Sequence, residues 1–249
     1  MRHLLAAGAS PDQPDATGST PLMKLASSRY FSPEIGNILL AAGANPLATD
    51  EDDDSALALA AHTGQYRALE WLLDECNVPI DITPSKGPYT GYTALHIACR
   101  RGYADCTQLL LARDAPIEAR NGEAATPLML AATNCTDLPP PQEVCANTLC
   151  LRLLLEAGAD PLTCDDDGWN ALHLASKAGC LAAVDTLLDA GHAYEQATQM
   201  TAMHCPWNPN MNPLDIVFDS RDYIEHHASP ATVNTIINRL LTAMDDDEV

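Results

Sequence analysis

The chain repeats itself with a period of 33 residues, and this period constrains the fold more than any other feature of the sequence. Two marks recur. Four-residue blocks of the form Thr-Pro-Leu-His begin at Thr20, Ser55, Thr93, Thr126 and Asn170, and apolar runs end at Gly8, Gly43, Cys76, Asp114, Gly158 and Gly191. A run ending precedes the next block by 12 residues in four of five cases, and a block precedes the next ending by 21 residues in three. The chain is therefore a tandem array of similar units.

Each block has the chemistry of a helix start. Thr, Ser and Asn are good N-cap residues, and proline fits the first helical position, where its missing N–H is not needed. A glycine nine residues after the cap stops this helix at Gly64, Gly102 and Gly179, and a second helix follows, as at 180–190. Such a unit cannot bury its own apolar face. The sequence therefore predicts an all-α solenoid in which helix pairs stack on one another.

These motifs resemble those of the ankyrin repeat family. The pattern Asp-x-x-Gly-x-Thr-Pro-Leu-His-x-Ala is nearly complete at 15–22 and again at 165–175, and the resemblance covers nearly the whole chain. It implies one ankyrin repeat domain over 1–249, an all-α solenoid of stacked helix-turn-helix units with β-hairpin-like fingers. We expect a half-repeat at 1–12, repeats near 13–47, 48–80, 81–118, 119–162 and 163–195, and a degenerate C-terminal capping repeat at 196–249.

The two ends of the array depart from the pattern. Residues 2–8 match only the second helix of a repeat, so we expect that the chain is cut from a longer protein or begins at an internal methionine. In the last unit, a block at 212–216 competes with one at 201–204, and its register stays open. Polar residues on the closing helix, among them Asn234 and Arg239, suit a capping repeat.

Three insertions break the period. One of five residues lies within 81–91, one of eleven residues lies within 133–148 and contains three consecutive prolines, and a small one lies between Thr20 and Gly43. Loops of this kind lengthen at little thermodynamic cost, so an insertion either contacts a partner or has drifted without a function. The sequence leaves both possibilities open.

The resemblance also implies where a partner would bind. Similar proteins bind through the fingers and the first-helix face, so the relevant positions lie just before each cap and seven or eight residues after it. The candidate partner-binding residues are Asp52, Asp54, His62, Tyr89, Tyr92, Arg100, Arg101, Glu123, Asp166, Asp167, Trp169 and Lys177. Tyr, Trp and Arg are over-represented at binding hot spots. The alternative is that Tyr92 and Trp169 pack between fingers and that the acidic runs are simply solvated.

The charge of the chain restricts the class of partner. With 13 Lys and Arg against 34 Asp and Glu, the net charge is −21, which excludes nucleic acid and anionic membrane surfaces. A protein with a basic or mixed-charge surface remains. No apolar stretch is long enough to span a membrane, and nine scattered cysteines do not form a disulfide framework. We expect a monomer in the cytoplasm or nucleus.

Metal binding and catalysis are both weakly supported. The Asp runs at 50–54 and 165–168 lack the later glutamate of a calcium loop, and the cysteines and histidines lack zinc spacing. A thiol nucleophile could pair Cys180 with His173 or Cys99 with His96, but these residues occupy ordinary repeat positions, where the two histidines are expected to be structural. We expect no cofactor, no metal and no enzyme activity.

The sequence thus predicts a protein–protein interaction scaffold or adaptor. The alternative is a targeting or regulatory module of a larger protein whose catalytic or effector domain lies outside this chain. A thiol or metal enzyme is a third possibility, which a bound metal or an abnormally reactive cysteine would reveal.

Overall fold

The computed structural model describes residues 2–133, 146–190, 214–215, 217 and 230–246. Within these ranges all regular secondary structure is helical, apart from one isolated antiparallel bridge between Thr49 and Ser55. The prediction of an all-α fold is confirmed. The competing blocks at 201–204 and 212–216, and the triple proline, lie wholly or largely outside the described residues.

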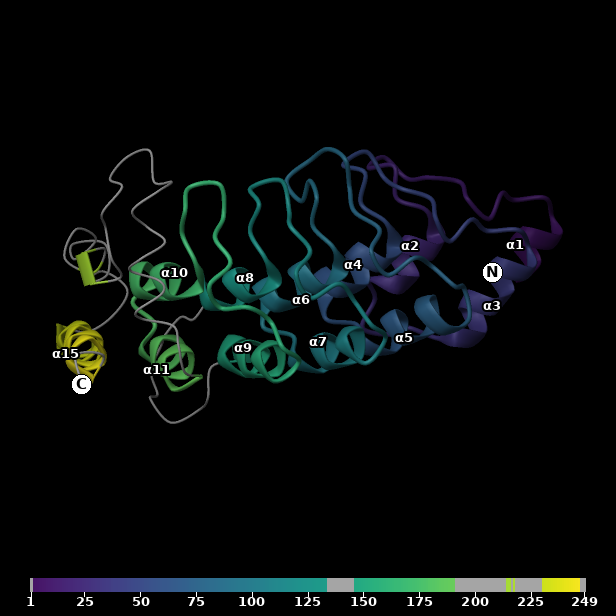
Figure 1. Cartoon of the computed structure of the whole chain (residues 1–249). Coiled ribbons are helices and arrows are strands. Elements are labelled where there is room, and N and C mark those ends of the chain that lie inside the picture. Colours follow the sequence, from purple (N-terminus) through teal and green to yellow (C-terminus); the bar gives the residue numbers. More distant parts are fainter. Residues whose placement is uncertain (1, 134–145, 191–213, 216, 218–229, 247–249) are drawn as a thin grey trace. The chain divides into compact units, whose positions relative to one another are not determined.

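The helices follow one another in pairs, as the repeat pattern predicts (Figure 1). The first helices of the pairs are α2 (Pro21–Ala26), α4 (Ala56–Thr63), α6 (Ala94–Arg101), α8 (Pro127–Thr133) and α10 (Ala171–Ala178). The second helices are α3 (Pro33–Ala41), α5 (Tyr66–Asp74), α7 (Ala104–Leu111), α9 (Ala146–Glu156) and α11 (Leu181–Asp189). The short α1 (Arg2–Ala6) precedes the pairs, and α15 (Pro230–Asp246) follows them.

The chain divides into two compact units. Unit 1 comprises Met1–Ala98 and Asp105–Pro116, and unit 2 comprises Cys99–Ala104 and Ile117–Val249. In unit 1, α2 packs on α3 and α4, and α4 packs on α5; in unit 2, α8 packs on α9 and α10, and α11 packs on α9, α10 and α15. First helices therefore contact the first helices of neighbouring repeats, which is the stacking expected of units that cannot bury their own apolar faces.

The predicted helix signals act as expected. The side chains of Thr20, Ser55 and Asn170 accept hydrogen bonds from backbone N–H groups in the first turns of α2, α4 and α10. Gly64 and Gly179 end α4 and α10 in the left-handed region, with φ of 69° and 70°. These bonds span two to four residues, so their partners can be read directly from the sequence.

The fourth residue of each block completes the cap. The imidazole Nδ1 of His96 accepts the N–H of Thr93 at 3.1 Å, and the thioether sulfur of Met23 accepts the N–H of Thr20 at 3.3 Å. His173 and Met129 make the same contact to their own cap residues, at 3.3 and 3.4 Å. Two chemically different side chains thus satisfy the same buried donor, which supports the structural role expected for these histidines.

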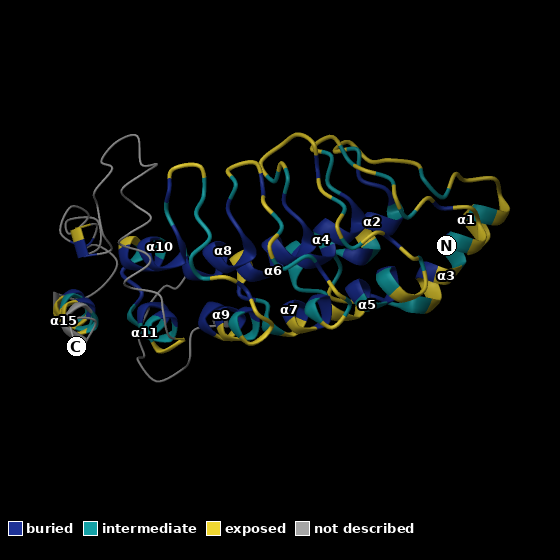
Figure 2. Cartoon of the chain, viewed as in Figure 1, coloured by how far each residue is buried: buried dark blue, intermediate teal, exposed yellow. Residues whose placement is uncertain are grey.

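The core consists largely of small side chains on the first helices. In α8 every residue except Thr133 is buried and in α4 five of eight are, whereas the second helix α5 buries four of nine (Figure 2). Ala60, Ala61, Ala131, Ala132 and Ala175 are all 0% exposed. Alanine at these positions lets neighbouring helices approach closely, which explains why so few aromatic residues are needed.

The two ends of the described chain differ in how they are covered. None of the residues of α1 is buried, and Leu4 at its centre is 66% exposed. At the other end, α15 packs on α11 through Val233, Ile236 and Leu240, which are fully buried. Arg239, one of the polar residues predicted for the closing helix, is partly exposed and pairs with Asp185 and Asp189 of α11.

Candidate functional site

Four fingers are built on the same turn. Asp15, Asp50, Asn121 and Asp165 each accept, through one side-chain oxygen, the backbone N–H groups two and four residues later, at 2.8 to 3.1 Å. A backbone N–H to C=O bond between the first and fifth residues closes each turn. The fourth residue of each turn has a positive φ: 77° at Gly18, 69° at Asp53, 57° at Ala124 and 81° at Gly168. The first residue of each turn, aspartate in three fingers and asparagine in one, therefore holds the turn, and the residues directly after it form the exposed tip.

Neighbouring fingers are joined by backbone hydrogen bonds. In unit 1 the N–H of Glu51 donates to the carbonyl of Thr17 at 3.4 Å, and in unit 2 the N–H of Asp166 donates to the carbonyl of Glu123 at 3.4 Å. The second bond places the exposed carboxylates of Glu123, Asp166 and Asp167 on two adjacent finger tips. Three predicted partner-binding residues are thus brought together.

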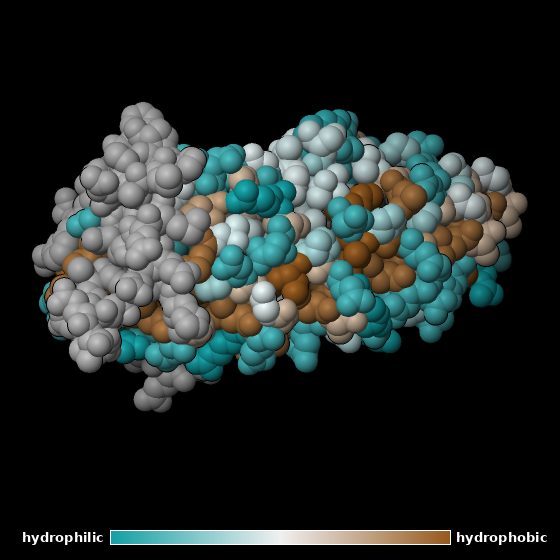
Figure 3. All heavy atoms as spheres, in the orientation of Figure 1, coloured by the Kyte–Doolittle hydropathy of each residue, from teal (hydrophilic) through white to brown (hydrophobic). Residues whose placement is uncertain are grey.

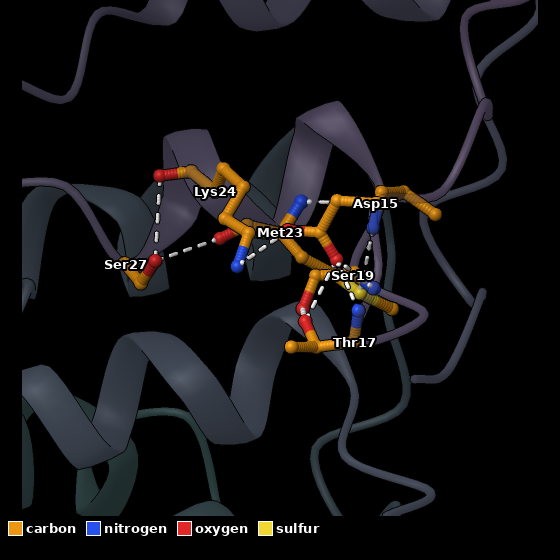
Figure 4. A network of polar contacts seen from close by, with 7 residues as sticks. Asp15, Thr17, Ser19, Met23, Lys24 and Ser27 are labelled. Atoms are coloured by element: carbon orange, nitrogen blue, oxygen red, sulfur yellow. Dashed lines mark hydrogen bonds and ion pairs between the residues drawn. The ribbon is translucent and has the colours of Figure 1, made fainter. Parts of the chain in front are cut away.

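The first finger shows how firmly such a turn is held (Figure 4). One carboxylate oxygen of Asp15 accepts the N–H and hydroxyl of Thr17, and the other pairs with Lys24 Nζ at 2.9 Å. These contacts, led by the Thr17 hydroxyl, hold the pKa of Asp15 well below its usual range. Asp15 and Lys24 therefore serve the turn itself.

The insertion at 81–91 lies against the acidic finger at 50–54. The backbone N–H and the hydroxyl of Ser85 donate to the carboxylate of Asp53 at 2.8 and 2.7 Å, and these bonds lower the pKa of Asp53. A Cβ on Gly87 would lie 2.8 Å from the carbonyl oxygen of Asp52. Asp53 and Ser85 were not among the predicted site residues, because no local pattern in the sequence links residues 32 positions apart.

Asp54 occupies an unfavourable position in the same finger. Its Oδ1 atom is buried and has no hydrogen-bond partner within the described residues. Burial, followed by the nearby charges of Asp50, Asp52 and Asp53, raises its pKa to about 6. The residue therefore destabilises the fold when it is ionised.

Asp54→Asn is expected to raise the free energy of unfolding at pH 7 by on the order of 1 kcal/mol, allowing for solvent screening. The folded-state pKa of Asp54, about 6, lies above the ordinary 3.8, so the folded protein holds the proton more tightly. The penalty is complete above the folded pKa and disappears as the pH falls below the ordinary value. Urea denaturation of both proteins between pH 4 and 7 measures it. A stability difference that stays constant over this range would contradict the assignment.

Four rings form a connected series in unit 1. The ring centroids of His62 and Tyr89 are 5.5 Å apart, those of Tyr89 and Tyr92 are 5.5 Å apart, and those of Tyr92 and His96 are 5.6 Å apart. Tyr92 is only 6% exposed, whereas His62 and Tyr89 are half-buried. Tyr92 therefore packs beneath Tyr89 and supports it, instead of facing a partner as its finger position suggested.

Trp169 and Lys177 form a cation–π pair in unit 2. The Nζ atom of Lys177 lies 4.3 Å from the centroid of the Trp169 ring. The backbone N–H of Trp169 donates to the carboxylate of Asp165 at 2.8 Å, and its carbonyl accepts from the Asp165 N–H at 2.9 Å. Burial raises the pKa of Asp165. The turn thus fixes the backbone of Trp169 at the base of the finger, and the partly exposed indole carries Lys177 on one face.

The remaining predicted residues lie on the surface. Arg100 and Arg101 are exposed at the end of α6, where Asn147 Nδ2 donates to the carbonyls of Cys99 and Arg100 at 3.1 and 3.3 Å.

Over the whole predicted set, seven residues are exposed: Asp52, Arg100, Arg101, Glu123, Asp166, Asp167 and Lys177. In the view of Figure 3, hydrophilic residues gather over the ends of the fingers. Apolar residues lie between the fingers and the second helices of the pairs. The tips therefore offer charge, and the finger bases offer aromatic rings.

The described residues give little to support catalysis or metal binding. Within the described ranges, no three His, Cys, Asp or Glu side chains are placed to share a metal ion. Cys99 and Cys180 are both 0% exposed, so neither thiol is accessible to a substrate. Among the described helices, none is long and apolar enough to cross a membrane.

Comparison with known proteins agrees with this architecture. The family model for ankyrin repeats matches residues 1–85, 78–138 and 142–217. The chain is 35% identical over 133 residues to the ankyrin repeat and KH domain-containing protein mask-1 of Caenorhabditis elegans, and 33% identical over 162 residues to the B-cell lymphoma 3 protein homolog of Mus musculus. These alignments cover 53% and 64% of this chain, but only 5% and 33% of the relatives.

Two solved structures share the fold over almost the whole chain. The human ASB11 ankyrin repeat domain superposes with a TM-score of 0.72 at 19% identity, covering 97% of this chain and 90% of that one. The ankyrin repeat domain of Bcl-3, described as a unique member of the IkappaB protein family, gives a TM-score of 0.67 at 26% identity, covering 95% and 90%.

Proposed function

Because the chain belongs to the ankyrin repeat family, whose repeats form protein–protein interaction modules, we propose that it is a scaffold or adaptor that binds a partner protein without catalysis. The binding surface consists of the finger tips and the exposed ends of the first helices. The observation that carries the proposal is the repeated turn: its backbone N–H groups are bonded, and it presents exposed carboxylates that have no ion pair within the part of the chain that the structure describes.

The turn geometry favours binding because the finger loops are already ordered before a partner binds. In two fingers the side-chain oxygens of Asp50 and Asp165 hold the loop before any partner arrives, so little conformational entropy is lost on association. At their tips Asp52, Asp166 and Asp167 are exposed and accept no hydrogen bond from the described residues. Such carboxylates are available to a partner.

The charge of these tips selects the partner. With a net charge of −21, the protein repels acidic surfaces and attracts basic or mixed-charge ones, which raises the association rate and suppresses wrong partners. Tyr89 and Trp169, half-buried beside the acidic tips, add aromatic area of the kind that contributes most at interfaces. A basic partner with arginine or apolar anchors fits both features. We further propose that the protein acts as a monomer in the cytoplasm or nucleus.

A second candidate function follows from the lengths of the relatives. The chain spans 5% and 33% of the two curated relatives, so it matches one segment of much longer proteins. The same surface would then target or regulate a catalytic or effector domain on the same polypeptide. The complete open reading frame distinguishes the two roles.

Affinity capture from a lysate, quantified by mass spectrometry, tests the proposed function. We expect a variant carrying Asp52→Asn, Asp166→Asn and Asp167→Asn to recover about tenfold less of the partner protein, or less still, since three interfacial charges are removed. The matched control carries Glu75→Gln, Asp105→Asn and Glu156→Gln, three exposed residues on or next to the second helices. Circular dichroism confirms folding. Equal loss from both variants would show that net charge, not the finger surface, is recognised.

A further inference from the structure

We infer that the indole face of Trp169 is a binding site for an arginine side chain of the partner, and that Lys177 occupies this site in the unbound protein. The inference rests on the proposed function and deepens it, because it names the chemistry that the partner must carry. It concerns unit 2 alone.

The backbone that carries the ring is held more firmly than the lysine that covers it. The backbone N–H and carbonyl of Trp169 both bond to Asp165, and Asn170 directly after it caps α10. Lys177 reaches the ring from the last turn of the same helix, with Nζ 4.3 Å from the centroid. Its side chain is exposed and forms no ion pair with the described residues. An exposed lysine therefore covers one face of an aromatic ring whose backbone is fixed by the turn.

The surroundings of the ring favour a cation from outside. The same finger carries the exposed carboxylates of Asp166 and Asp167, and the neighbouring finger carries that of Glu123, joined through the bond from Asp166 N to the Glu123 carbonyl. Arg120, the basic residue closest to Glu123 in sequence, is directed instead to the carbonyl of Cys164. An incoming cation thus meets uncompensated negative charge.

Arginine fits this site better than lysine does. A planar guanidinium stacks on an indole and leaves its N–H donors pointing outward in the plane of the group, where they can reach carboxylates. The ammonium of Lys177 is a strongly hydrated point charge and, among the described residues, its recorded contact is with the ring. A partner arginine can therefore gain both interactions, and the displaced lysine returns to water at little cost.

Titration of the full chain with a labelled peptide of four Gly-Arg-Ser repeats, followed by fluorescence anisotropy, tests the inference. We expect Lys177→Ala to bind this peptide about three- to fivefold more tightly, because the competitor is removed, and Trp169→Ala to bind it about five- to tenfold more weakly. The same peptide with citrulline in place of arginine keeps the shape, loses the charge and should not bind measurably.

Two controls separate the site from general electrostatics and from misfolding. Arg152→Ala removes one positive charge from an exposed position on α9, away from the ring in the fold, and should leave affinity within about 1.5-fold. Trp169→Phe keeps an aromatic face and should retain intermediate affinity if Trp169→Ala fails to fold. Equal effects of Lys177→Ala and Arg152→Ala, or equal binding of the citrulline peptide, would overturn the inference. If lysate capture still depends on the finger carboxylates, only the arginine site is rejected, and the proposed function stands.

Discussion

Trp71→Ala is expected to lower the free energy of unfolding of unit 1 by about 3–5 kcal/mol, as for other buried aromatic residues. The indole is 5% exposed, and its N–H donates to Asn37 Oδ1 at 3.1 Å. Its ring lies 5.6 Å from that of Phe31, so one side chain on α5 joins two segments of the preceding repeat. Alanine at position 71 would leave both partners, Phe31 and Asn37, without the indole that they contact. Urea denaturation followed by far-ultraviolet circular dichroism measures the loss.

The same ring explains the buried Gly36 in α3. A Cβ at this position would lie 2.6 Å from Cζ2 and 2.8 Å from Cη2 of Trp71, so Gly36→Ala should destabilise the protein by about 1–3 kcal/mol despite the better helix propensity of alanine. In a Trp71→Phe background the clashing atoms are absent. There, Gly36→Ala should become neutral or stabilising, and the two substitutions should be strongly non-additive. Additive effects of the two changes would show that the glycine is required for another reason.

Ile236→Ala should lower the free energy of unfolding by about 2–5 kcal/mol, because Ile236 is fully buried where α15 packs on α11. Val233 and Leu240 lie on the same side of α15, at helical spacing, and are also 0% exposed. Since α15 packs on α11, these buried apolar side chains let α15 cover the last of the helix pairs. Thermal denaturation and hydrogen exchange of α11 amides measure the effect.

Arg239→Gln provides the matched comparison on the same helix. Arg239 pairs with Asp185 at 2.5 Å and with Asp189 at 3.0 Å, but both ion pairs are solvent-accessible. Exposed ion pairs contribute about 0–1 kcal/mol, so this change should have a much smaller effect than Ile236→Ala. If Arg239→Gln lowered the free energy of unfolding as much as Ile236→Ala, α15 would be held by its charges and not by its apolar face.

The repeat architecture was predictable because its signals are local. The caps at Thr20, Ser55 and Asn170, and the left-handed glycines that end the helices, act through bonds between residues at most four positions apart. The positions of the exposed finger carboxylates follow from the same repetition, since each finger reproduces one turn. The fold class and the acidic character of the candidate surface could therefore be read from spacing and residue type.

The environment of individual site residues was not predictable. Tyr92 and Trp169 occupy the same place in their repeats, yet one is 6% exposed beneath Tyr89 and the other is partly exposed beneath Lys177. The difference arises because the insertion at 81–91 folds back on one finger, through the bond from Ser85 to Asp53.

Which elements form, and in what order, follows from short stretches of sequence, because helix caps and turns depend on the backbone geometry of a few consecutive residues. Packing between repeats sets the rest: which side chains lie under a neighbouring loop, which carboxylates hold a turn, and which stay exposed to a partner. Those outcomes depend on contacts between residues that lie about 30 or more positions apart in the sequence and meet only when neighbouring repeats stack. No local sequence pattern encodes such contacts.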